Sequence, residues 1–277
     1  MRAPTFQHMP SSTPFWWVVA IATVFVVAGL ASAHHMESAG HWVTGMNNRV
    51  VWGVPHVFAV FLIVSASGAL NAASIASVFG REAYKPLSRL SALMAITLLV
   101  GGLTVLVLDL GRPDRLIVAM THYNFRSIFA WNIFLYTGFI VLVVVYLWMM
   151  FEPRMNRFVG RVGTTAFAWR LMLTTGTGSI FAFLAAREAF DSAVLAPMFI
   201  AMSLSFGTAL TLILSALIFS IRGDGLPTEL MLNLRRLLAY FIIAVAFFVG
   251  VDNLTRLYGE EHYSVERFIL LEGGIYS

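Results

Sequence analysis

The sequence contains no cysteine and few charged residues. Without thiolate ligands the chain cannot itself hold an iron–sulfur cluster or attach a c-type haem. Charged residues make up 12% of the 277 residues and hydrophobic residues 59%, whereas soluble domains carry about a quarter charged residues. This composition, together with several apolar runs of about 20 residues, predicts an all-α integral membrane protein.

Seven complete membrane spans are predicted from the apolar runs, at residues 15–33, 54–79, 90–109, 128–151, 165–186, 194–220 and 236–252. We expect them to form one polytopic helical bundle, a single transmembrane domain over residues 1–277. A further apolar run begins at Phe268. Its ten residues rise only about 15 Å as a helix, half of a bilayer, which suits an interfacial tail or the start of an eighth span. We favour the second interpretation, a sequence truncated at its C-terminus.

The first span has two interpretations. Its apolar run ends in the sequence ASA at residues 31–33, which resembles the cleavage site of a signal peptide. The run is long for a signal peptide, however, and it opens with Trp16 and Trp17, which suit an interfacial anchor. Retention of this span is therefore favoured over its cleavage.

Basic residues are distributed unevenly between the two sides of the predicted bundle. One side comprises the N-terminus and the loops after the second, fourth and sixth spans. It holds four acidic residues and eleven of the 18 basic ones: Arg2, Arg81, Lys85, Arg89, Arg154, Arg157, Arg161, Arg170, Arg222, Arg235 and Arg236. The other side holds seven basic and ten acidic residues. By the positive-inside rule, the N-terminus is cytoplasmic and the connections after the first, third, fifth and seventh spans face outward. The net charge of +4 therefore reflects topology rather than nucleic-acid binding.

Most histidines and acids fall at the outward ends of the spans under this topology. An ionisable group near a span end can reach water, and arginines there are typical of topology and lipid-phosphate contacts. His34, His35 and His41 form only a weak metal-binding pattern, and no metal site is predicted. His56 differs, because it lies inside an apolar run after Pro55 and needs a polar partner there.

The second predicted span contains small residues at regular spacing. Ser65, Ala69, Ala73 and Ser77 recur every four residues, and Gly68, Ala72 and Ala76 form a parallel series. Small residues at this spacing let neighbouring helices approach closely. The pattern predicts a centrally packed helix, which would carry His56 into the bundle rather than toward lipid. By contrast, the stretch TGTGS at residues 175–179 lies in a span and is not a nucleotide-binding loop.

Four segments together resemble the membrane-integral subunits of the NrfD/polysulfide reductase family: WGVPHVFAVFLIVSASGAL, YKPLSRLSALMA, VLDLGRPDR and HYNFRSIFAWNIFLY. The resemblance is strongest over residues 49–151, and within the family it is greatest to the DsrP subgroup of the Dsr sulfite-reduction-associated complex. One loop departs from the family pattern. Where the family usually has NPTSPMSWG, this chain has NFRSIFAWN, with Phe125 and Ile128 in place of two prolines and Asn132 in place of a glycine.

The resemblance implies a subunit of the bacterial inner membrane that has no haem or iron–sulfur cluster of its own. It would bind menaquinone or ubiquinone near the outer face. There it would exchange electrons with a periplasmic iron–sulfur subunit, alongside cytochrome subunits and in sulfur-compound metabolism. The family's histidine early in the second span and the acid that closes the third match His56 and Asp109 here.

A hypothesis for the site follows from these matches and from quinone chemistry. A flat apolar ring with two carbonyls needs an apolar slot with a hydrogen-bond partner, and quinol oxidation also needs a proton acceptor. We assign His56 to a carbonyl, Asp109 to proton acceptance and Arg112 to electrostatic support of Asp109. Trp131 would form the wall and His122 the rim of the pocket, while Glu188, Asp252 and Asp109 would carry protons.

Three other functions remain open at this stage. A b-type haem subunit would need axial histidines on facing helices, and His122 is the nearest mate of His56 by depth. A proton- or ion-translocating transporter would place its charges near the membrane midplane and show internal repeats, and no obvious repeat is present here. A passive membrane anchor of a redox complex would tolerate replacement of His56 and Asp109.

Overall fold

The computed structural model describes residues 11–47, 50, 52–184, 187, 190–223, 225–259 and 262–273. Regular structure in this part of the chain is helical throughout, with no strand. The longer helices are α1 (Thr13–Ala39), α2 (Val54–Ala69), α3 (Asn71–Ser77), α4 (Lys85–Leu108), α6 (Ile128–Phe151), α7 (Val159–Ala182), α8 (Leu195–Arg222) and α9 (Thr228–Tyr258). Short helical segments connect or follow them: η1 (His41–Thr44), η2 (Glu82–Tyr84), η3 (Pro113–Arg115), α5 (Leu116–Thr121), η4 (Pro153–Phe158), α10 (Tyr263–Arg267) and η5 (Phe268–Glu272).

Six helical segments among the described residues are long and apolar enough to cross a membrane. They are α1, the combined α2 and α3, α4 with η2, α6, α8 and α9. Each has at least 24 residues, which rise about 36 Å against a hydrocarbon core of about 30 Å. The helix α7 has the same length but carries Arg161, Arg170 and a run of threonine and glycine. Of the seven predicted spans, six are therefore both long enough and apolar enough to cross a membrane. The seventh, α7, is long enough but not apolar enough.

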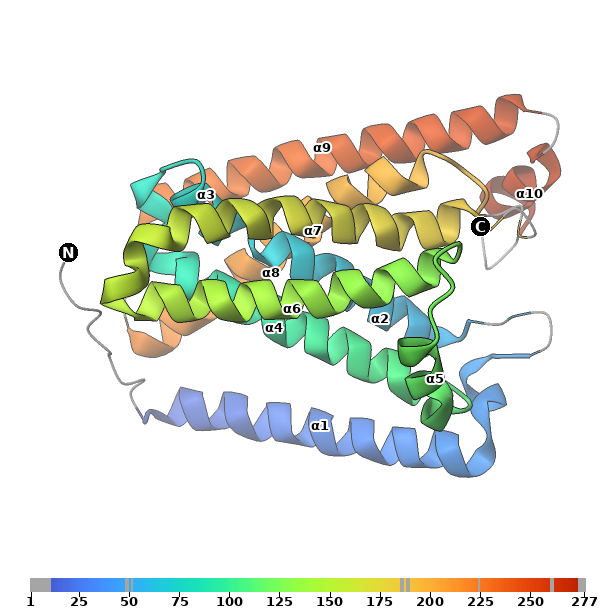
Figure 1. Cartoon of the computed structure of the whole chain (residues 1–277), viewed down its shortest axis with the longest axis horizontal. Helices are drawn as coiled ribbons and strands as arrows, with labels where there is room; N and C mark the ends of the chain where they lie inside the picture. The colour runs from blue at the N-terminus through green and yellow to red at the C-terminus, as the bar shows by residue number, and fades with distance from the viewer. Residues whose placement is uncertain are drawn as a thin grey trace.

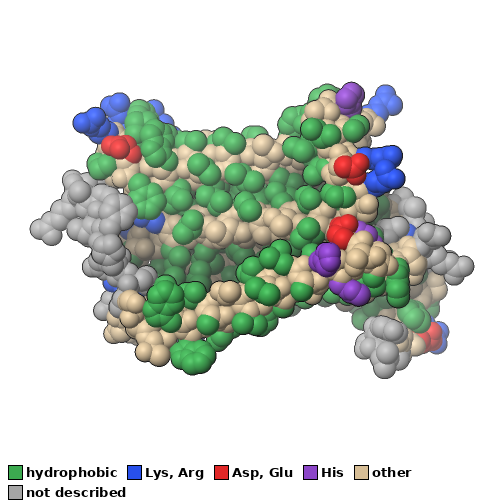
Figure 2. Space-filling model, turned by 90° about the horizontal axis from the view of Figure 1, so that it is seen from below, with side chains coloured by type: hydrophobic (Ala, Val, Ile, Leu, Met, Phe, Trp, Pro, Cys, Tyr) green, Lys and Arg blue, Asp and Glu red, His purple; other side chains and the backbone are tan. Residues whose placement is uncertain are grey.

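The long helices run side by side and alternate in direction, so that the connecting segments gather at two ends of the bundle (Figure 1). The end that contains η1, α5 and α10 is called the α5 end here, and the opposite one, with η2 and η4, is called the η2 end. Charged and histidine side chains gather at these two ends, and the surface between them is mainly hydrophobic (Figure 2). This distribution is that of a multi-pass integral membrane protein.

The helix α2 lies at the centre of the bundle and packs against α4, α7 and α8. Its small residues are buried as predicted, with Ser65 and Ala69 fully shielded. A Cβ atom added to Gly68 would lie 1.6 Å from the backbone oxygen of Ser203, and one added to Gly207 would lie 2.0 Å from the backbone of Gly68. The backbones of α2 and α8 therefore touch with no side chain between them, the packing that small residues at four-residue spacing allow.

The core also contains an arginine. Arg170, in α7, is 3% exposed. The topology count placed it among the loop charges, and that assignment was wrong. Its guanidinium donates to the backbone oxygen of Ser67 (3.0 Å) and to Oδ1 of Asn71 (2.5 Å), and lies 4.7 Å from the ring centroid of Phe167. These contacts come from neighbouring α2 and α3 and from α7 itself, and they compensate the guanidinium for the water that it loses on burial.

Candidate functional site

A cavity of about 580 Å³ lies inside the α5 end of the bundle. Residues of α2, α4, α5, α6 and α7 line it, most of them apolar, such as Ile63, Leu106, Met120 and Ile133. Its polar groups fall into two sets. His56 and Asp109 form one set, and Asn132, Tyr136, Thr137 and Thr177 form the other, on the wall made by α6 and α7. A mostly apolar cavity of this size with a few polar groups is typical of a site for a small organic ligand.

Asp109 and His56 are in direct contact at this cavity. The carboxylate of Asp109 has no exposed surface, and one of its oxygens makes an ion-pair contact with Nδ1 of His56, whose side chain is 18% exposed. Nδ1 of His41 lies 4.0 Å from the other carboxylate oxygen, and its Nε2 lies 3.9 Å from Glu37. Asp109 thus sits between two imidazoles. A buried carboxylate at the C-terminal end of a helix needs such partners, because burial and the helix dipole both disfavour its charge.

The local sequence explains why these two side chains meet. The helix α4 ends at Asp109, whose backbone N–H donates to the carbonyl of Val105 (3.1 Å), and Gly111 and Pro113 prevent the helix from continuing. On α2, Pro55 stands in the first turn, where its missing N–H has no intrahelical role, and His56 follows it. Since α2 and α4 pack along their length, the start of one lies beside the end of the other.

The opposite wall of the cavity is a small polar network between α6 and α7. Asn132 is buried, and its amide donates to the backbone oxygens of Ile128 (2.9 Å) and Gly176 (3.1 Å). The hydroxyl of Thr177 donates to Oδ1 of Asn132 (3.4 Å) and lies 3.3 Å from the hydroxyl of Tyr136. A Cβ atom added to Gly176 would lie 2.7 Å from Cδ1 of Leu135, so that the leucine side chain would have to shift.

A second cavity of about 450 Å³ adjoins the first on the other side of His56. The two cavities share Trp52, His56, Val60 and Phe181. Trp52 and Phe181 meet edge to face, with ring centroids 5.1 Å apart. These rings, with His56, form the partition between the two cavities.

Three residues that the sequence assigned to the site do not line the larger cavity. Arg112 is exposed and makes no ion pair with Asp109 among the described residues. The side chains beside the Asp109 carboxylate are instead the imidazoles of His56 and His41. His122 is exposed, with Nδ1 3.0 Å from the hydroxyl of Thr121. Trp131 is 49% exposed, and its indole donates to the carbonyl of Phe125 (2.9 Å). Successive residues of a helix point about 100° apart, so that Asn132 faces the cavity and Trp131 does not.

The two further proton-transfer candidates lie elsewhere. Asp252 is buried near the α5 end of α9, where it accepts from the hydroxyl of Ser192 and from Nε of Arg256 (3.1 Å). It does not line the larger cavity. Glu188 lies outside the described residues.

Sequence reasoning missed several residues of the site: His41 as a partner of Asp109, and Trp52, Tyr136, Thr177 and Phe181 as parts of the cavity walls. Helical spacing could have found one of them. Tyr136 stands four residues after Asn132 in α6, which places the two on one face of that helix, whereas Trp52 precedes the first residue of α2. Within the described residues, no group of three or more histidine, cysteine, aspartate or glutamate side chains could hold a metal ion.

Residues 42–277, which include both cavities, match the family described as polysulphide reductase, NrfD. The chain belongs to this family. Among curated proteins it is 29% identical over 229 residues to the Hdr-like menaquinol oxidoreductase integral membrane subunit of Archaeoglobus fulgidus, covering 83% of this chain and 58% of that protein. It is 27% identical to the menaquinone reductase integral membrane subunit of Nitratidesulfovibrio vulgaris, over 52% of this chain and 35% of that protein. It is also 25% identical to the protein NrfD of Escherichia coli, over 79% and 74%.

Family membership places the chain among multi-pass membrane subunits and agrees with its apolar helices. The chain spans less than two thirds of the length of the Archaeoglobus and Nitratidesulfovibrio relatives. The matched region begins within η1, so α1 lies outside it and the His56–Asp109 pair inside.

Proposed function

We propose that this NrfD-family subunit binds a quinone or quinol in the 580 Å³ cavity and exchanges electrons between it and a partner subunit of a redox complex. Two relatives are described as a menaquinol oxidoreductase and a menaquinone reductase membrane subunit, which supports a quinone as the substrate. The observation that carries the proposal is the contact of His56 with Asp109 at the edge of an otherwise mostly apolar cavity.

The cavity suits a quinone in shape and in polarity. The ring and its isoprenoid tail are apolar and match the aliphatic and aromatic side chains of α2, α4 and α6. The ring carbonyls need hydrogen-bond donors, and His56 offers one. Because Nδ1 of His56 is engaged by Asp109, its Nε2 is the nitrogen left for the ligand. The hydroxyls of Tyr136 and Thr177 offer polar contacts on the opposite wall.

The His56–Asp109 pair also provides a place for a proton. Quinol oxidation releases two electrons and two protons, and a group within hydrogen-bond reach of the ring oxygen must accept each proton. Nε2 of His56 would take a proton from the quinol oxygen, and Asp109 would stabilise the imidazolium that forms. His41, beside the other oxygen of Asp109, would stabilise that carboxylate further and lead toward the end of the bundle. Asp252 and Glu188 would serve in later proton transfer.

The electron partner would be an iron–sulfur subunit that docks at the α5 end, which we assign to the periplasmic face. The excess of basic residues in the connections at the other end supports this orientation, with a cytoplasmic N-terminus and α7 as a seventh span. In this proposal the complex lies in a bacterial inner membrane and includes cytochrome subunits. The resemblance to the DsrP subgroup supports a role in sulfur-compound metabolism.

The test is a fluorescence-quench titration of a quinol-analogue inhibitor against the purified protein and its variants. His56→Ala and Asp109→Asn should each weaken binding about tenfold or more, because each removes one member of the ion pair at the cavity. Asp114→Asn is the matched control, since Asp114 is exposed five residues beyond Asp109 and does not line the cavity. It should leave the affinity unchanged.

Saturable binding to the wild type that is weakened only in the His56 and Asp109 variants would support the proposal. Absence of saturable binding to the complex assembled with its partner subunits would reject a quinone site and favour a passive membrane anchor. Equal affinity in all variants would place the ligand elsewhere in the protein. An optical spectrum of the same sample distinguishes a haem subunit, which would show a Soret band.

A further inference from the structure

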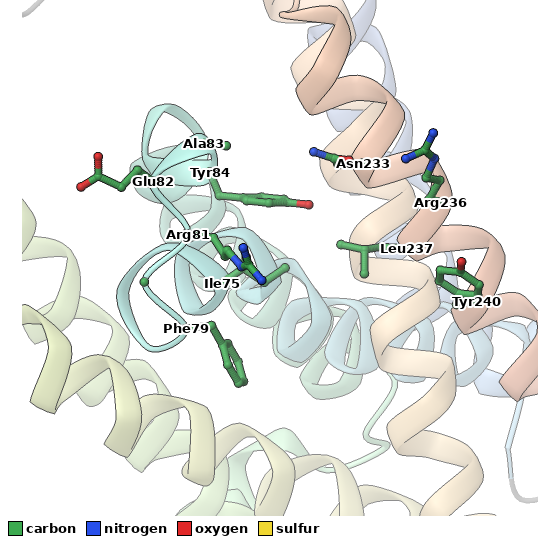
Figure 3. Close-up of a pocket in the computed structure, with 11 residues that line it drawn as sticks. Ile75, Phe79, Arg81, Glu82, Ala83, Tyr84, Asn233, Arg236, Leu237 and Tyr240 are labelled. Carbon is green, nitrogen blue, oxygen red and sulfur yellow. The ribbon is translucent and has the colours of Figure 1, made fainter.

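A separate cavity of about 780 Å³ lies at the η2 end of the bundle, far along the helices from the quinone site. It opens between the connection from α3 to α4 and the first turns of α9. Figure 3 shows Arg81 and Tyr84 projecting toward α9, with Asn233 and Leu237 projecting back toward them. Nothing in the proposed redox function uses this cavity.

Four side chains of this cavity are hydrogen-bond donors that make no hydrogen bond to any described residue. Tyr84 is only 7% exposed, yet its hydroxyl makes no hydrogen bond to any described residue and faces the cavity. The side chains of Arg81, Asn233 and Arg236 likewise have no hydrogen bond or ion pair within the described part of the chain. The hydroxyl of Tyr84 is therefore open to the cavity and available to a ligand.

One acidic side chain lines this cavity, and it does not neutralise the arginines. The carboxylate of Glu82 points away from α9 (Figure 3) and forms an ion pair with Nζ of Lys85 at 2.5 Å. Two guanidinium groups, a phenol and an amide therefore face one space with a net positive charge. This set of donors fits an oxyanion that has several acceptor oxygens, such as a phosphate, which a guanidinium can bind through two parallel hydrogen bonds.

The apolar part of the cavity indicates where such a phosphate comes from. Ile75 and Leu237 line its inner part, while Phe79 (59% exposed) and Tyr240 (66% exposed) stand at its surface. The cavity lies near the ends of two membrane-crossing helices, where phospholipid headgroups meet their acyl chains. Basic pockets between transmembrane helices on the positively charged side bind anionic lipids.

We infer that this cavity binds an anionic phospholipid, with the phosphate held by Arg81, Arg236 and Tyr84 and an acyl chain along Phe79 and Tyr240. The lipid would brace α9 against the rest of the bundle. Tyr84 and Leu87 already pack against Leu230 and Leu234 of α9 in a small apolar cluster, which borders the cavity. A lipid here would extend that contact outward along α9.

Native mass spectrometry of the full chain in detergent tests this inference, with phosphatidylglycerol, phosphatidylcholine and inorganic phosphate as probes. Phosphatidylglycerol should bind saturably at one site, and phosphatidylcholine about tenfold more weakly. The double variant Arg81→Gln/Arg236→Gln should weaken phosphatidylglycerol binding roughly 25-fold, since each basic residue near an anionic lipid contributes roughly fivefold. Tyr84→Phe keeps the ring in its apolar cluster and should cost about fivefold.

Arg235→Gln is the matched control. Arg235 neighbours Arg236 on α9, is exposed and does not line the cavity, so its replacement removes the same charge without touching the site. Equal loss of affinity in Arg235→Gln and Arg236→Gln would overturn the inference, because a diffuse positive field would then suffice. Equal binding of the two lipids would overturn it as well. Displacement of phosphatidylglycerol by inorganic phosphate would show that the cavity takes a free oxyanion instead of a lipid. The variants replace surface arginines or keep the aromatic ring, and a circular-dichroism melt confirms that each one is folded.

Discussion

Nδ1 of His56 contacts the carboxylate of Asp109 across the junction of α2 and α4, so that two residues 53 positions apart in the chain form one ion pair. A carboxylate that holds one imidazole nitrogen fixes the ring orientation and strengthens the other nitrogen as a base. Neither residue performs this role alone, and their effects on ligand binding should therefore be coupled.

A double-mutant cycle measures this coupling. His56→Ala, Asp109→Asn and the combined variant should be non-additive in their affinity for a quinol analogue, with a coupling free energy of about 1–3 kcal/mol. The control cycle combines His56→Ala with Asp114→Asn, which is exposed, and should be additive within about 0.5 kcal/mol. Additive effects in the first cycle would mean that the two residues act independently.

The contact between α2 and α8 predicts a large difference between two glycines. Gly68→Ala should destabilise the protein by about 3 kcal/mol or more, because the new Cβ atom would overlap the backbone of Ser203, which cannot move aside as a side chain could. Gly250→Ala on α9 meets nothing within 4 Å and should stabilise its helix by about 0.5–1 kcal/mol. Thermal unfolding in detergent would measure both, and equal melting temperatures would contradict the packing of α2 against α8.

Arg170→Met tests the buried arginine. The methionine fills similar space but leaves Oδ1 of Asn71 and the backbone oxygen of Ser67 without their donor, at a cost of about 1–3 kcal/mol. Arg161→Met removes the same charge from an exposed position of α7 and should change stability by less than about 0.5 kcal/mol. If both variants melted like the wild type, the guanidinium of Arg170 would contribute nothing to the fold.

Glu266 gives the protein a pH dependence that can be assigned to one residue. It is 4% exposed, and burial raises the pKa of its carboxyl group, while Arg256 lowers that pKa and Asp252 raises it. Because the pKa is higher in the folded state, protonated Glu266 stabilises the fold. That contribution is complete below the pKa of the unfolded state and is lost as the pH rises through the folded value.

Glu266→Gln should therefore gain stability relative to the wild type as the pH rises, and the difference should shrink at acidic pH. Asp114→Asn, at an exposed acid, serves as the reference. Thermal melts across this pH range measure the effect. A constant difference between Glu266→Gln and wild type at every pH would assign the effect to packing rather than to ionisation.

The sequence predicted the helices well because apolar length and small-residue spacing are local signals. The helix α6 matches the predicted span 128–151 at both ends. The central position of α2 follows from its serines, alanines and glycines. Long polar side chains were harder to place. The topology count assigned Arg170 to a loop, whereas acceptors on α2 and α3 allow its burial, and such acceptors are visible only once the helices are packed.

The site was predictable in part for the same reason. Polarity within an apolar run identified His56, and the family pattern identified Asp109, which the structure brings together. Proximity in sequence suggested Arg112 as the partner of Asp109, but the turn at Gly111 directs that arginine to the surface. The wall of α6 depends on which of two adjacent residues, Trp131 or Asn132, faces inward. Both are compatible with the sequence, and helix rotation decides between them.

The glycine contact between α2 and α8 limits how the 580 Å³ cavity can open. At Gly68 and Gly207 the backbones of α2 and α8 are in direct contact, so α2 has no side chains there that could rearrange. The end of α2 that is far from His56 is therefore held in place. The short α5 on the opposite side of the cavity is held far less firmly, with Ile117 66% and Met120 44% exposed. We expect α5 to move more readily than α2. A ligand would therefore enter the cavity by displacing α5, while His56 keeps its contact with Asp109.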